Sequence, residues 1–212
     1  MNINVGSGHL VLDGFVNLDN SLFLKLSRSP FQWILKPFLN ESKKEIIRLF
    51  TEASKRAELR KYDCRKRMPF EDNSVSHILC SHFLEHLFHD QCILLLKEFT
   101  RVLKPGGTMH VILPDLRLCV ERYLSNDSPE AADELMSLLL SYEKPGLTLR
   151  SKLLDLTGNF GLHHLWMYDR RSMEHKISQI GLCVDINLST PSSAFRKGDD
   201  SLHIFAYKPL SY

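Results

Sequence analysis

The stretch M-N-I-N-V-G-S-G-H-L-V-L-D-G-F-V-N-L-D, residues 1–19, decides the fold that we predict for the rest of the chain. Its two short apolar runs, at residues 3–5 and 15–18, are each typical of a strand. The second run ends at Asp19, whose carboxylate could accept hydrogen bonds from both hydroxyls of a ribose. Because ligands of an open parallel sheet bind beyond the carboxyl ends of its strands, this stretch predicts a nucleoside-binding edge.

A glycine-rich turn, Gly6-Ser7-Gly8, follows the first run and would let the backbone come close to a ligand. A dinucleotide-binding turn needs a third glycine and then a helix whose N-terminus faces the pyrophosphate. Here the third position holds Val11, and the nine residues 6–14 leave no room for a normal crossover helix. The sequence therefore argues against a nicotinamide dinucleotide, whereas a cofactor without phosphates would not need that helix.

Predicted strands and helices alternate from residue 2 to residue 124, which favours an α/β fold with a parallel sheet. After the first two strands we expect helices within residues 21–57, strands at 59–63, 75–80 and 108–113, and helices at 91–103 and 116–124. The pattern then changes to a helix at 129–142, a last helix that ends near residue 180, and closing strands at 183–188 and 202–207. No helix fits between the closing strands, so we expect them to pair as an antiparallel hairpin at the sheet edge.

The composition is that of an ordinary globular domain, with 43% hydrophobic and 25% charged residues among 212. A net charge of +2 gives no reason to expect a nucleic acid or a membrane surface as partner. The five cysteines are scattered and odd in number, no leader is recognisable and no apolar run is long enough to span a bilayer. We therefore expect a cytoplasmic protein without a membrane span, and the sequence does not indicate its oligomeric state.

Three further motifs carry a family resemblance: D-C at 63–64 with M-P-F-E-D-N-S at 68–74, S-H-F-L-E-H at 81–86, and R-V-L-K-P-G-G at 101–107. With the opening stretch, these motifs resemble a class I S-adenosylmethionine-dependent methyltransferase of the methyltransferase type 11 family. The resemblance covers residues 2–115 well. It implies a Rossmann-like, seven-stranded, mostly parallel sheet with a C-terminal antiparallel hairpin and a helical insertion after strand 5. We expect a single domain over residues 1–212, with a lid-like insertion at about 126–165.

The resemblance also implies S-adenosyl-L-methionine as the cofactor and assigns a role to each matching residue. The glycine-rich turn Gly6, Ser7 and Gly8 would hold the methionine and ribose side. The remaining cofactor residues would be Asp19 and Asn20 for the ribose, Asp63 and Cys64 for the adenine, and Ser81 and His82 for the sulfonium end.

The chain departs from the family pattern at the first loop, where Asn4 stands in place of the usual acid and the first crossover is short. An asparagine can hydrogen-bond but supplies no negative charge toward a cationic cofactor. A subset of bacterial members, often associated with surface polysaccharide synthesis, shows a similar shortened opening. These departures motivate an alternative, a non-catalytic cofactor-binding or regulatory protein with a methyltransferase fold.

Residues 82–86 also match H-x-x-E-H, in which two histidines of one helical face hold zinc. His89 extends this histidine run. The metalloprotease motif needs a long helix and a downstream acidic ligand, whereas this one directly follows an apolar strand. We therefore expect no metal, and structural histidines at a helix start are the simpler interpretation.

A basic stretch between residues 55 and 67 would suit nucleic acid, but Glu52 and Glu58 interleave with it and the whole chain is nearly neutral. We interpret it as a solvated surface, so nucleic acid is not the expected partner. A weaker alternative is that Arg65 and Arg67 help to hold an anionic acceptor.

The segment H-H-L-W-M-Y at residues 163–168 concentrates functional side chains outside the cofactor motifs. Related methyltransferases of polysaccharide gene clusters carry a similar stretch. We predict methyl transfer to an oxygen or nitrogen of a small-molecule or saccharide acceptor, with His163 or His164 as the general base. Trp166 and Tyr168 would shape the pocket, unless the segment is only a packed aromatic anchor for the lid.

Overall fold

The computed structural model describes residues 1–30, 34, 39, 41–140, 163–185 and 201–210. The strands are β1 (Asn2–Val5), β2 (Phe15–Asp19), β3 (Leu59–Lys61), β4 (Val75–Ser81), β5 (Leu103–Pro114), β6 (Cys183–Val184) and β7 (Ser201–Tyr207). The helices are α1 (Leu22–Ser27), α3 (Glu41–Arg56), the 3-10 turn η2 (Leu84–His86), α4 (His89–Val102), α5 (Leu116–Leu124), α6 (Ala131–Leu140) and α8 (Arg170–Gln179). The parts of the expected elements at 31–40, 141–142 and 186–188 lie largely outside these described residues.

The strands form one seven-stranded sheet in the order β3-β2-β1-β4-β5-β7-β6. The first five are parallel neighbours, β7 runs antiparallel to β5, and β6 pairs antiparallel with β7 at the edge. This order confirms the predicted mostly parallel sheet and its closing antiparallel pair. Residues 6–14 between β1 and β2 form turns and no helix, as the short connection predicts.

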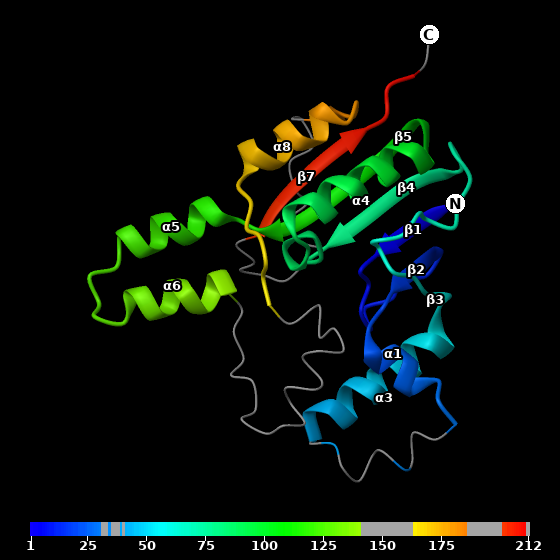
Figure 1. Ribbon diagram of the computed structural model, residues 1–212, viewed down its shortest axis with the longest axis horizontal. Helices are drawn as coiled ribbons and strands as arrows, with labels where there is room; N and C mark the ends of the chain where they lie inside the picture. The colour runs from blue at the N-terminus through cyan, green and yellow to red at the C-terminus, as the bar shows by residue number, and fades with distance from the viewer. Residues whose placement is uncertain (31–33, 35–38, 40, 141–162, 186–200, 211–212) are drawn as a thin grey trace.

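The main core lies between the sheet and the helices α4 and α8, which cover the same face of β4, β5 and β7 in Figure 1. Alternate residues of the central strands point into it, and α4 contributes a stripe at helical spacing. The stripe consists of Cys92, Leu95, Leu96, Phe99 and Val102, each with no exposed surface. A second cluster joins α1 and α3 to Leu59 and Val11, beside β2 and β3.

Two of the family motifs between β3 and β5 are joined to each other by hydrogen bonds. The Arg101 guanidinium donates to the carbonyl oxygens of Phe70 (2.9 Å) and Met68 (3.1 Å) and to both oxygens of Glu98. Glu98 in turn accepts the Met68 N–H at 2.7 Å. The M-P-F-E-D-N-S loop is thus fastened to the end of α4, so this part of the motif set is structural.

Helices α5 and α6 follow β5 and project together from one side of the sheet (Figure 1). α5 occupies the predicted residues, and its first turn is capped by Asp115, whose side chain accepts the Arg117 N–H. α8 begins after Asp169, whose side chain accepts the Ser172 N–H, and is followed by Gly181 at φ +85°. The remainder of the predicted lid-like insertion, residues 141–162, lies outside the described residues.

Candidate active site

The glycine-rich turn lies at the carboxyl end of β1, between two neighbouring strands. Val5 is paired with Leu18 of β2 on one side and with Cys80 of β4 on the other. The Gly6 and Ser7 N–H groups both donate to the Leu18 carbonyl oxygen, at 2.9 and 3.1 Å. The parallel register therefore brings the turn, the end of β2 and the end of β4 to one edge of the sheet.

The two glycines of this turn are needed for different reasons. Gly6 has φ +71°, and a Cβ there would lie 2.3 Å from Cγ of Phe83. Gly8 has φ +55°, but a Cβ there would meet no atom within 4 Å. A larger residue at position 6 would clash with the Phe83 side chain, so glycine is needed there. Gly8 instead borders open space where a ligand could approach.

The carboxylate of Asp19 is held by the backbone on both sides. Its Oδ2 accepts the Gly8 N–H at 3.0 Å, and its Oδ1 accepts the Ser21 N–H at 2.7 Å. Burial raises the pKa of the Asp19 carboxyl, while these two donors and the nearby His9 act in the opposite direction. Each oxygen keeps a further lone pair, so the carboxylate can still accept two ribose hydroxyls. Asn20, the other predicted ribose residue, is exposed beside it.

A buried pair of asparagines shapes the first loop, and the sequence analysis missed it. Asn4 Nδ2 donates to Asn17 Oδ1 at 3.0 Å and to the Leu10 carbonyl at 3.3 Å. Asn17 has no exposed surface; it also accepts the Leu12 N–H and donates to the carbonyls of Leu12 and Glu58. Asn4 therefore organises the short crossover. The signal was the presence of two asparagines at buried positions of neighbouring apolar strands.

The predicted adenine residues follow β3 at the same edge, since the Tyr62 N–H donates to the Asp19 carbonyl oxygen at 2.9 Å. The Arg65 guanidinium donates to both oxygens of Asp63, at 2.9 and 2.8 Å, and lowers the pKa of that carboxyl. Burial raises the pKa of the neighbouring Cys64 thiol to about 12, which keeps it neutral. An adenine amino group would therefore share Asp63 with Arg65.

Of the predicted sulfonium-side residues, Ser81 is the last residue of β4 and His82 follows it. His82 has φ +49°, and its N–H donates to the Ile112 carbonyl at 2.8 Å. Its ring nitrogen Nε2 lies 3.2 Å from Ser201 Oγ, and Nδ1 lies 3.4 Å from Oε1 of Glu85. His82 thus connects the cofactor edge with the turn η2 that follows.

Residues 163–166 lie against η2. The N–H groups of Leu165 and Trp166 both donate to the Glu85 carbonyl oxygen, at 2.7 and 3.1 Å. Nδ1 of His86 lies 2.9 Å from the His163 carbonyl oxygen. The structure therefore places His163 and His164 beside the H-x-x-E-H segment, although nearly eighty residues separate the two in sequence.

His164 is also attached to α6. Its Nδ1 lies 3.1 Å from the Leu138 carbonyl oxygen, and its N–H donates to the Leu140 carbonyl at 3.1 Å. Burial is the main reason that the pKa of the His164 imidazole is lowered. The ring is therefore neutral at neutral pH and retains a lone pair on Nε2.

The two aromatic residues of this segment have different environments. Tyr168 is 1% exposed and belongs to the main core, where burial raises the pKa of its hydroxyl. Trp166 is 48% exposed, and its ring centroid lies 5.2 Å from that of His89. Tyr168 therefore fits the alternative of a packed anchor, and Trp166 is the aromatic residue available at the surface.

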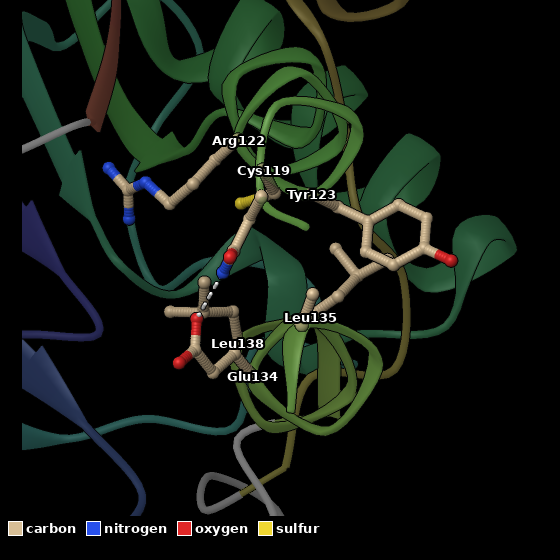
Figure 2. Close-up of a pocket in the computed structure, with 8 residues that line it drawn as sticks. Cys119, Arg122, Tyr123, Glu134, Leu135 and Leu138 are labelled. Carbon is tan, nitrogen blue, oxygen red and sulfur yellow. Dashed lines mark hydrogen bonds between the residues drawn. The ribbon is translucent and has the colours of Figure 1, made fainter. Parts of the chain in front are cut away.

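A separate shallow pocket lies between α5 and α6 (Figure 2). It is lined by Cys119, Arg122, Tyr123, Asn126, Ala131, Glu134, Leu135 and Leu138. Asn126 Nδ2 donates to Glu134 Oε2 across it at 3.1 Å. None of these lining residues is a predicted site residue, but the carbonyl oxygen of one of them, Leu138, faces Nδ1 of His164.

The residues at this edge fit S-adenosylmethionine. Gly8 borders open space, and Asp19 retains lone pairs for a ribose. The turn after β1 offers no helix N-terminus, which a pyrophosphate would need. The assignment of cofactor residues stays a prediction, and it comprises Gly6, Ser7, Gly8, Asp19, Asn20, Asp63, Cys64, Ser81 and His82.

A known protein family matches part of this chain. The family described as methyltransferase domain matches residues 39–111, roughly a third of the chain. A search of curated proteins gives no match. In the part of the chain that the structure describes, no helix is both long and apolar enough to cross a membrane.

Solved structures share the fold. A S-adenosylmethionine-dependent methyltransferase from Methanosarcina mazei is 18% identical, with a TM-score of 0.56 over 99% of this chain and 92% of that one. The YcgJ protein of Bacillus subtilis is 10% identical, with a TM-score of 0.52 over 99% and 92%. An O-methyltransferase family protein from Burkholderia thailandensis is 11% identical, with a TM-score of 0.52 over 100% of this chain and 51% of that one.

These likenesses establish the fold, and the family match over residues 39–111 is to a methyltransferase domain. The chain therefore carries a methyltransferase-domain match on a fold that it shares with S-adenosylmethionine-dependent methyltransferases.

Proposed function

We propose that this protein transfers the methyl group of S-adenosylmethionine to an oxygen or nitrogen of a small-molecule or saccharide acceptor. The observation that carries the acceptor side of this proposal is the position of Glu85. Its carboxylate faces His82 at the cofactor edge, and its carbonyl oxygen binds residues 165–166. Functional side chains from two distant segments thus meet next to the cofactor residues.

The chain's own residues have two tasks in this reaction. When bound, the cofactor supplies a methyl group on a sulfonium, which is a good leaving group. Gly8 and Asp19 would fix the ribose end, and Ser81 and His82 would bound the reacting end. What remains is to hold the acceptor in line and to exclude water, which an enclosed site does efficiently.

The acceptor must also lose a proton, and His163 or His164 is the group that we propose for this step. His164 is favoured because burial keeps its imidazole neutral, and a base has to be neutral before it accepts a proton. Its Nδ1 faces a carbonyl oxygen, so Nε2 is the nitrogen that could take the proton. Trp166, exposed next to His89, would offer a flat apolar surface of the kind that packs against sugar rings.

A non-catalytic cofactor-binding protein is the second candidate, motivated by Asn4 and the short crossover. The buried Asn4–Asn17 pair supports the enzyme instead, because it gives the loop a fixed conformation without the usual acid. We also propose a cytoplasmic location, which the five free cysteines support.

Radiolabelled methyl transfer to a panel of glycosides, phenols and amines tests the proposal. We expect turnover with at least one class, and a loss of about 10²-fold or more in kcat for His164→Ala with little change in KM. His175→Ala, an exposed histidine of α8, is the matched control and should keep full activity. Binding of S-adenosylhomocysteine without turnover on any acceptor would favour the non-catalytic candidate.

A further inference from the structure

We propose that Glu85, His86 and His164 form a binding site for a divalent transition-metal cation of the zinc type. The cation site stands on its own geometry, while its use in catalysis rests on the proposed function. It revises the expectation of no metal that the sequence alone gives.

The first argument is the state of the Glu85 carboxylate. Glu85 is 1% exposed, and neither side-chain oxygen accepts a hydrogen bond from any residue that the structure describes. His82 Nδ1 lies 3.4 Å from Oε1, but this contact does not have the geometry of a hydrogen bond. Taking a carboxylate out of water is costly unless a positive partner compensates, so buried carboxylates are paired or bind metals.

The second argument is the arrangement of the three side chains. One ligand atom from each lies within 4.8 Å of the others. Ligands of a tetrahedral ion are roughly 3.4 Å apart, given metal–ligand distances of about 2.1 Å. Small side-chain rotations would close that difference, since His86 and His164 are only partly buried.

The third argument is the tautomer of the two rings. Nδ1 of His86 faces the His163 carbonyl, and Nδ1 of His164 faces the Leu138 carbonyl, at 2.9 and 3.1 Å. A carbonyl oxygen only accepts, so each Nδ1 must carry the hydrogen and each Nε2 keeps its lone pair. Metal-binding histidines are oriented in this way by carbonyl or carboxylate partners.

The donor set points to the kind of cation and its use. Two imidazoles and one carboxylate suit zinc, iron or cobalt better than calcium or magnesium, which prefer oxygen ligands. Three protein ligands leave at least one position open, as catalytic sites do. An acceptor hydroxyl bound there would release its proton to water, and the oxygen would keep the electron pair. His164 would then act as a ligand of the cation instead of as the base.

The site differs from the metalloprotease motif that residues 82–86 resemble. That motif places two histidines on one long helix, whereas η2 is a single turn of three residues. Here the second imidazole comes from residue 164, which the hydrogen bonds to Glu85 and Leu138 bring alongside. This long-range pairing is not visible in the sequence motif.

Calorimetric titration of tag-free, chelator-treated protein with zinc, and absorption spectroscopy with cobalt, test the site. We expect one cation per chain and cobalt bands typical of a four- or five-coordinate ion. Glu85→Gln and His164→Ala should each weaken zinc binding by about 100-fold or more, since loss of a supporting residue alone costs 10–100-fold. His175→Ala should bind as the wild type does.

Titration of the same proteins with S-adenosylhomocysteine separates this proposal from the proposed function and shows that the variants are folded. A wild type that binds S-adenosylhomocysteine but neither cation overturns the metal site only. Zinc binding that is equal in wild type and both variants also overturns it. Zinc binding without S-adenosylhomocysteine binding supports the metal site and contradicts the proposed methyl transfer.

Discussion

Asp19 is the last residue of β2 and Glu85 follows β4, yet these two acidic side chains differ in their hydrogen-bond partners. Asp19 accepts a backbone N–H on each oxygen, from Gly8 and Ser21. Glu85 is almost fully buried, and no hydrogen bond to its side chain is found among the described residues. A carboxylate that already accepts hydrogen bonds can position a neutral ligand, whereas a buried carboxylate that accepts none is stabilised by a nearby cation.

The two regions meet at the contact between Gly6 and Phe83. Gly6 belongs to the cofactor turn, and Phe83 precedes η2, which carries Glu85 and His86. The first region depends on backbone geometry over a short stretch of chain. The second depends on hydrogen bonds between residues about eighty positions apart. Variants at the Gly6–Phe83 contact and variants within each region can therefore test the cofactor turn and the η2 region separately.

The largest loss of stability is expected at the contact between Gly6 and Phe83. Gly6→Ala would place a methyl group 2.3 Å from Phe83 Cγ at a positive φ, and should cost about 3 kcal/mol or more of unfolding free energy. Gly8→Ala is the matched control, because it meets only the cost of its positive φ, about 1–2 kcal/mol. Urea unfolding measures both. Equal losses would show that Phe83 does not restrict Gly6.

The second prediction concerns the two carboxylates, whose replacement should change the free energy of unfolding in opposite directions. In metal-free buffer, Asp19→Ala should lose about 1–2 kcal/mol of stability, because two backbone donors lose their acceptor. Glu85→Leu should instead gain about 1–3 kcal/mol, because it replaces a buried carboxyl group whose oxygens accept no hydrogen bond by an apolar side chain of similar size. Denaturant unfolding in the presence of a chelator reads out both changes. Destabilisation by Glu85→Leu would mean that Glu85 is paired in solution.

The smallest effect concerns the pH dependence of the adenine residue. Arg65 lowers the pKa of Asp63 in the folded state, so the pair adds stability above the unfolded pKa of about 3.9 and loses it as pH falls through the folded pKa. Because Arg65 is half exposed, Arg65→Ala should cost less than about 1 kcal/mol at pH 7 and nothing near pH 2. Lys97→Ala, an exposed α4 variant, should show no such pH dependence. A constant deficit from pH 7 to pH 2 would exclude the ion pair as its cause.

The sheet was predictable from the sequence because its signals are local. Each local pattern indicates one strand, turn or helix: the apolar runs, the glycines after β1 and the stripe on α4. The order of these elements along the chain then indicates the sheet topology. Asp19 was also predictable, since its partners Gly8 and Ser21 are close in sequence and follow from a strand that ends at an acid.

The acceptor side was not predictable to the same depth. Burial of Glu85 and its proximity to His164 arise from contacts of residues 163–166, which periodicity does not encode. Tyr168 lies in the main core, and periodicity does not encode that position either. The sequence identified Asn4 only as a departure from the family pattern; in the structure its amide is bound within the loop, because Asn17 lies opposite it on the next strand.

The most direct test of the cofactor edge is calorimetric titration with S-adenosylhomocysteine. We predict one-to-one binding to the wild type, at least tenfold weaker binding to Asp19→Ala, and unchanged binding to Asp13→Ala, an exposed acid of the same loop. No binding to the wild type, or equal affinity of Asp19→Ala and wild type, would contradict the assignment of this edge to S-adenosylmethionine.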